Sequence, residues 1–67
     1  MTAGQKIELA RSAIHQAIYQ SEAVHSAAIH NMYVSRETCD DLESLITLLG
    51  VCESSIGGIS DKIHEAG

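Results

Sequence analysis

The sequence predicts an all-α fold: an antiparallel two-helix hairpin that dimerises into a four-helix bundle. Apolar residues recur at three- and four-residue spacing through both halves of the 67-residue chain, as they do in amphipathic helices. One break separates the halves, and the chain contains no proline, which would interrupt a long helix. We expect helices at about residues 5–33 and 36–64, in a single domain covering residues 1–67, with residues 1–4 and 65–67 frayed.

The first helix is predicted from an alanine-rich composition between Gln5 and Tyr33, because alanine has the highest helix propensity. Thr2 is a candidate N-cap, since its side chain can accept a hydrogen bond from the first helical turn. The apolar stripe of this helix alternates large and small residues, which favours close packing against a second helix. The stripe consists of Ile7, Ala10, Ile14, Ala17, Ser21, Val24 and Ala28.

A turn is predicted at residues 33–36. Ser35 can cap the second helix by accepting a hydrogen bond from the backbone N–H of residue 37 or 38. Val34 and Cys39 occupy the two positions of a hydrophobic staple around that cap. Acidic residues follow in or just after the first turn, where the helix dipole favours carboxylates. These signals agree on where the second helix begins.

The second helix carries the most regular apolar pattern in the chain. Its stripe consists of Leu42, Leu45, Leu49, Cys52, Ile56, Ile59 and Ile63. Gly50, Gly57 and Gly58 lie inside this helix, and each costs it about 0.5–1 kcal/mol relative to alanine. Because the stripe continues in phase beyond them, we expect the helix to reach about His64, with the glycines at outward positions.

An antiparallel hairpin requires the two stripes to pair in a constant register. They do, because the residue numbers of successive pairs sum to 69 or 70, from Ala28 with Leu42 to Ile7 with Ile63. Seven layers are therefore predicted, including Val24 with Leu45 and Cys52 buried opposite Ala17. The predicted oligomer core is Ile7, Ile14, Val24, Leu42, Leu45, Leu49, Cys52, Ile56, Ile59 and Ile63.

Self-association is expected because two helices joined by one turn bury only a single stripe each. Chains of this size need further stabilisation, and two cysteines thirteen residues apart on one helix cannot form a disulfide. Further apolar residues widen the stripes into a bundle face; these are Ile18, Met32, Cys39, Ile46 and Leu48. A homodimer is the simplest closed arrangement. A higher oligomer is the alternative to the dimer.

The composition argues against several classes of function. The net charge is −5 with only four lysines and arginines, so no basic patch is available for nucleic acid or for an anionic membrane surface. No fully apolar run exceeds three residues, whereas a membrane-spanning helix needs far more. Two unpaired thiols suit a reducing compartment. We therefore expect a soluble, cytoplasmic protein that binds neither nucleic acid nor membrane.

No catalytic, cofactor or metal site is predicted. His15, His25, His30 and His64 are spaced by ten, five and thirty-four residues, whereas ligands on one helix need spacings of three or four. The Cys39 thiol lies beside Asp40, and burial is expected for Cys52; both conditions oppose formation of a thiolate nucleophile. We expect a protein that is not an enzyme.

The outward stripe of the first helix is lightly charged and carries two tyrosines, which are common anchors at protein interfaces. All of the net charge lies in residues 36–67, where it forms an acidic rim. The candidate partner contacts are His15, Tyr19, Ile29, Tyr33, Asp40, Asp41 and Glu43. These features predict an interaction protein that regulates, inhibits or adapts an unidentified partner protein. Two alternatives are an oligomer that sequesters a small ligand between subunits and a purely structural oligomerisation element.

Overall fold

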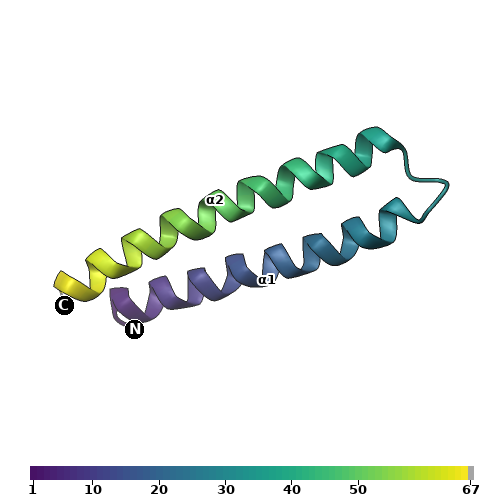
Figure 1. Cartoon of the computed structure of the whole chain (residues 1–67). Coiled ribbons are helices and arrows are strands. Elements are labelled where there is room, and N and C mark those ends of the chain that lie inside the picture. The colour runs from purple at the N-terminus through teal and green to yellow at the C-terminus, as the bar shows by residue number, and fades with distance from the viewer. Residues whose placement is uncertain (67) are drawn as a thin grey trace.

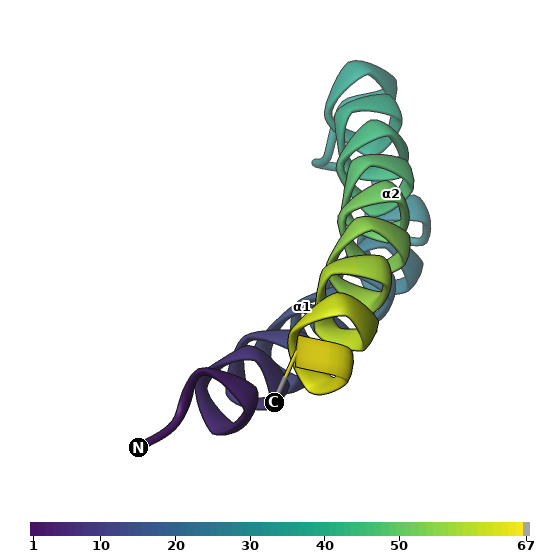
Figure 2. The ribbon, with the colours of Figure 1, turned by 90° about the vertical axis from the view of Figure 1, so that its left-hand side faces the viewer.

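The computed structural model describes residues 1–66 and consists of two long helices. Helix α1 (Ala3–Ile29) and helix α2 (Arg36–Ala66) lie side by side and antiparallel, with both termini at one end and the connecting turn at the other (Figure 1). The Cα atoms extend over 51 × 18 × 11 Å. Turned by 90°, the same ribbon bows along its length as a single layer of two helices (Figure 2). The predicted all-α hairpin is confirmed.

Helix α1 begins at Ala3 because Thr2 caps it, as the sequence predicts. The Gln5 backbone N–H donates to the Thr2 hydroxyl oxygen at 3.2 Å, and the Thr2 N–H donates to Gln5 Oε1 at 2.9 Å. This reciprocal pair is a capping box, which satisfies two N–H groups that an uncapped helix leaves without partners. The helix therefore starts two residues before the predicted Gln5.

Helix α1 ends at Ile29 and not near Tyr33, so the predicted C-terminal boundary is wrong by four residues. Asn31 is the physical reason. Its side-chain oxygen accepts a hydrogen bond from the Tyr33 N–H at 2.9 Å, and its carbonyl accepts from the Val34 N–H at 3.1 Å. This local turn competes with the next helical turn. Tyr33 therefore lies in the connection between the helices.

Helix α2 begins at the predicted cap. The Thr38 N–H donates to Ser35 Oγ at 3.2 Å, and Val34 and Cys39 of the predicted staple are both half-buried. The helix continues without a break through Gly57 and Gly58 to Ala66; Gly67 lies outside the described residues. A Cβ atom added at Gly50, Gly57 or Gly58 would have no atom within 4 Å, so these glycines leave the packing undisturbed.

The predicted antiparallel register is consistent with the contacts that join the two helices. Side chains meet across the hairpin at Glu8 with Ser60, His15 with Glu53, and His25 with Glu43. The residue numbers of each pair sum to 68, a constant register that lies within two residues of the predicted sums of 69 and 70.

The predicted stripe of α2 divides into two sets, each with seven-residue spacing. The first set is half-buried between the helices and consists of Leu42, Leu49, Ile56 and Ile63. The second set is exposed in the single chain and consists of Leu45, Cys52 and Ile59. Val24 of α1 is likewise exposed. The hairpin of one chain therefore leaves these four residues of the predicted layers exposed.

A different set of α2 residues completes the contact with α1. It lies one position further round the helix and consists of Cys39, Ile46, Glu53 and Ser60, all at least half-buried. Two of its members are polar, and they are accommodated because they pair with Glu8 and His15 of α1. The apolar arc of α2 is thus wider than one partner helix can cover, and its remainder faces away from α1.

Very little of the chain is buried. Among the described residues only Ala28 and Ser60 fall in the buried class, and most large apolar side chains keep substantial exposure. By length and composition alone, α2 is also apolar enough to cross a membrane. Core helices of soluble proteins meet the same criterion, but they are mostly buried, whereas 0% of the qualifying window of α2 is buried in the single chain.

Candidate interaction surfaces

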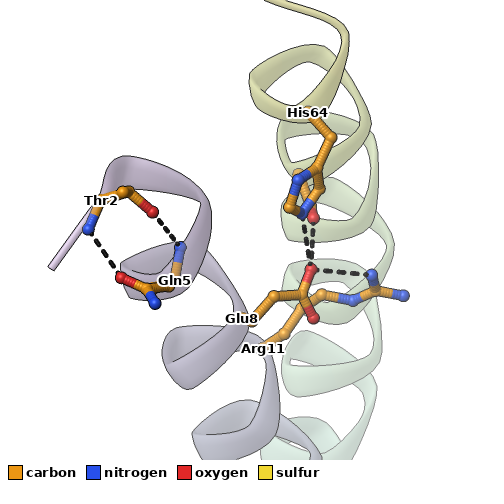
Figure 3. Close-up of polar contacts among 6 residues, drawn as sticks. Thr2, Gln5, Glu8, Arg11 and His64 are labelled. Carbon is orange, nitrogen blue, oxygen red and sulfur yellow. Dashed lines mark hydrogen bonds and ion pairs between the residues drawn. The ribbon is translucent and has the colours of Figure 1, made fainter. Parts of the chain in front are cut away.

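One edge of the hairpin is a line of polar contacts between the helices, and Glu8 lies at the centre of its densest cluster. The buried Ser60 hydroxyl donates to Glu8 Oε1 at 2.8 Å, and His64 Nε2 lies 3.1 Å from the same oxygen. Arg11 approaches Glu8 at 3.6 Å from the next turn of α1 (Figure 3). This cluster ties the open end of the hairpin together, beside the Thr2–Gln5 capping box.

The His64 ring reaches Glu8 by passing close to the backbone of α1. A Cβ atom added at Gly4 would lie 3.1 Å from His64 Cε1, which is closer than ordinary van der Waals contact. The absence of a side chain at Gly4 therefore makes room for the ring. Neither Gly4 nor the Glu8 cluster was found from the sequence, because no local motif links residues more than fifty positions apart.

The cluster lowers the pKa of the Glu8 carboxyl. The hydrogen bond from Ser60 is the largest cause, followed by the hydrogen bond to His64, and both favour the ionised form. A carboxyl whose pKa is lower in the folded state stabilises the fold above its unfolded pKa of about 4.3, and this contribution is lost as the pH falls through the folded value.

We therefore expect the Glu8→Gln variant to melt at a lower temperature than the wild type at neutral pH. The gap should close as the pH falls through the lowered pKa of the wild-type carboxyl, which then also becomes neutral. Thermal melts followed by circular dichroism between pH 7 and pH 3 measure this. Glu22→Gln, at an exposed position on the same helix, is the control. A gap of constant size across this range would show that Glu8 acts by packing alone.

Two further histidine–glutamate pairs continue along this polar edge. His15 Nδ1 lies 3.2 Å from Glu53 Oε2, and His25 Nε2 lies 3.5 Å from Glu43 Oε1. His15 and Glu43, which the sequence assigns to partner contact, are thus engaged within the hairpin, although both remain exposed. In residues 1–66 no group of three or more potential metal ligands is found.

The opposite edge of the hairpin is apolar, and we call it the side surface. It combines Ala10, Ala17 and Val24 of α1 with Leu45, Leu48, Cys52 and Ile59 of α2. Helical periodicity places these residues away from the histidine–glutamate pairs. The four large aliphatic side chains among them are 44–63% exposed. Exposed apolar side chains gathered on one edge are typical of an interaction site.

The turn end of the hairpin carries a second exposed group, which we call the tip. It consists of Ile29, Met32 and Tyr33, whereas the exposed Tyr19 lies nearer the middle of α1. Tyr19 is 69% exposed and Tyr33 is 91% exposed, so neither ring contributes much to the packing of the hairpin. Asp40 and Asp41 are also exposed, in the first turns of α2. The structure thus leaves most of the sequence-predicted contact residues accessible.

Two open grooves accompany these surfaces. The larger has a volume of about 1020 Å³ and lies at the open end, where Leu9, Ile63 and His64 contribute to a largely apolar lining. The smaller, of about 650 Å³, follows the polar edge beside His15 and Glu53. Cys39 is half-buried and Cys52 is exposed, and both are free thiols. The expected burial of Cys52 is therefore not found in the single chain.

The side surface and the tip are the strongest candidates for contact with another molecule. Both present apolar or aromatic side chains that the hairpin itself does not cover. The polar edge, in contrast, has its histidine and glutamate side chains paired across the two helices. No protein-family model matches the chain, and no curated protein or solved structure matches it either.

Proposed function

We propose that this chain is a small homo-oligomeric protein–protein interaction module, a cytoplasmic regulator or inhibitor of a partner protein. The observation that carries the proposal is the exposure of apolar side chains on a hairpin in which, among residues 1–66, only Ala28 and Ser60 are buried. An isolated hairpin of this size gains little from burial, whereas association would cover more of its apolar surface. A homodimer forming a four-helix bundle supplies that cover.

Self-association is tested by light scattering after size exclusion, at several chain concentrations and with added reductant. We expect a species of twice the chain mass of 7.2 kDa that persists in reductant. Circular dichroism on the same samples should show that helicity falls as dilution dissociates the dimer, because association and folding are linked. A stable helical monomer would overturn the proposal.

The tip, together with Tyr19, is the proposed contact site for the partner protein. Tyrosine is among the residues that most often carry binding energy at interfaces, and truncation of such a residue typically costs about 2 kcal/mol or more of binding free energy. Asp40 and Asp41 would supply an electrostatic rim that attracts a basic partner surface. Their position beside the tip supports a partner with basic residues around an apolar centre.

We expect combined Tyr19→Ala and Tyr33→Ala substitutions to weaken capture of the partner and to leave thermal stability nearly unchanged, within about 0.5 kcal/mol. The physical reason is the high exposure of both rings in the hairpin. Melting curves and pull-down experiments with the double variant measure the two effects. Leu9→Ala, at an exposed position on the far part of α1, is the control. A large loss of stability would instead place the tyrosines in the bundle.

The second candidate function is sequestration of a small ligand between subunits. The polar groove beside His15 and Glu53 favours it, because a polar cavity enclosed by a second subunit would suit a ligand recognised by imidazole and carboxylate groups. Mass spectrometry of the native oligomer tests this candidate: a co-purifying small molecule supports it, and a ligand-free oligomer counts against it.

A further inference from the structure

The side surface has a centre, which the register of the hairpin defines. Ala17 and Cys52 share the middle layer of the predicted register, with Ala10 and Ile59 in the next layer on one side. Val24 and Leu45 occupy the corresponding layer on the other side. The exposed apolar residues are therefore arranged evenly about Cys52, as expected for a surface that pairs with an identical copy of itself.

The exposed area of the chain is larger than that of a compact protein of the same mass. The chain exposes 5081 Å², whereas a folded monomer of this mass exposes about 4,100 Å². The excess of roughly 1,000 Å² is comparable with the area of about 800 Å² that each partner loses in a standard protein interface. One second copy on the side surface would thus remove most of the excess.

Charged residues are nearly absent from the side surface and its outer margin. Of the thirteen charged residues, only Lys6, Asp41 and Lys62 share the helical positions that form this edge. Asp41, which is spaced from Leu48 and Lys62 by multiples of seven residues, lies on the same margin of α2 as they do. This leaves a face on which a second apolar surface can lie without burying unpaired charges.

Two symmetric arrangements of a second copy would bury the side surface. With the two-fold axis along the hairpin, α2 packs on α1 of the second copy, and Lys62 lies beside Lys6 of that copy. With the axis across the hairpin, α2 packs antiparallel on the other α2, and Asp41 lies beside Lys62. The first brings like charges together twice, and the second forms two attractive pairs.

We infer that a second copy of this chain covers the side surface with the two-fold axis across the hairpin, passing beside Cys52. This inference rests on the proposed self-association and specifies its surface and register. Leu45 then packs against Ile59 of the second copy, and the two Ala17 residues meet in the same central layer. The polar edge, the tip and Asp40 stay outside the interface, available to a partner protein, whereas Asp41 pairs with Lys62 of the second copy.

The two Cys52 thiols are consequently placed face to face at the axis. Helices that pack through their side chains have axes 8–10 Å apart, so residues that face each other at the crossing come near the Cα separation of a disulfide. Cys39 lies at the turn end, away from the axis. Cross-linking by diamide, which accepts the two electrons and two protons released by the thiols, therefore reports this register.

The first experiment compares Cys39→Ser, which retains Cys52, with Cys52→Ser, which retains Cys39. Both are first shown to be dimeric by light scattering, then treated with diamide and analysed on non-reducing gels. Because facing thiols in a dimer have an effective concentration of millimolar order, Cys52 should cross-link roughly a hundredfold faster than Cys39 at micromolar concentration. The difference should vanish in urea. Equal rates for both variants in the native dimer would overturn the inference.

The second experiment distinguishes the two symmetry axes in a chain without its native cysteines. Chains carrying Lys62→Cys are mixed and re-associated with chains carrying either Asp41→Cys or Lys6→Cys. Cross-linked heterodimers with Asp41→Cys support the proposed axis, whereas heterodimers with Lys6→Cys place the axis along the hairpin and overturn it. If light scattering shows dimers, the proposed self-association stands whichever axis the cross-linking supports. If it shows monomers alone, both the proposed self-association and the inferred axis are wrong.

Discussion

Replacement of Leu49 by aspartate is expected to abolish helicity and self-association together. Leu49 is half-buried in α2, and the predicted register places it in a central layer opposite Ser21. Removing a core leucine costs about 2–5 kcal/mol, and the new carboxylate has no partner in that layer. A chain of this length has a total folding free energy of only about 3–10 kcal/mol. The hairpin therefore has little stability left to keep it folded.

Far-UV circular dichroism and light scattering measure the two effects of Leu49→Asp on the same samples. Ser44→Asp is the matched control, because it adds the same charge at an exposed position on the same helix and should change stability by less than about 0.5 kcal/mol. Full helicity in the Leu49 variant would show that this residue does not lie between the helices, and that the register is different.

Replacement of Ile59 by aspartate is expected to dissociate the dimer. Ile59 is 51% exposed in the single chain, so a monomeric hairpin would tolerate the change. In the inferred dimer each copy buries Ile59 against Leu45 of the other, so one substitution removes two apolar contacts. At roughly 1.5 kcal/mol or more for each side chain, the dissociation constant should rise about a hundredfold or more.

The concentration dependence of light scattering for Ile59→Asp gives this dissociation constant. Val51→Asp is the control, since Val51 is 60% exposed but lies on the outer side of α2, away from the side surface. If both variants weaken the dimer equally, then the side surface is not where the second copy binds. A dimer unaffected by either change would have the same meaning.

The helix starts were predictable from the sequence because each depends on a local hydrogen bond. Thr2 and Ser35 cap α1 and α2 through atoms only three residues away. The end of α1 depends on an equally local signal, the side chain of Asn31, which is a common turn residue. The alanine-rich composition by itself predicts a longer helix, to Tyr33, because it takes no account of the turn that Asn31 forms.

The division of apolar residues between the hairpin contact and the side surface was not predictable from spacing. Each apolar arc is wide enough to touch two neighbours, and spacing does not say which edge faces which neighbour. The hairpin uses the edge that includes Glu53 and Ser60, because their partners Glu8 and His15 are supplied by α1. Ile18 and Ile46, which share that edge, were the available signal.

The constant register across a single turn also determines how the chain can fold. Contacts nearest the turn close the shortest loops, and each later layer toward the termini encloses a longer one at a small additional entropic cost. Folding should therefore begin at residues 30–35 and continue layer by layer toward the termini, so that the Glu8–Ser60 contact forms last. Substitutions near the turn would then slow folding, and those at the open end would mainly accelerate unfolding. Amide hydrogens of the open end should exchange with solvent before those of the central layers.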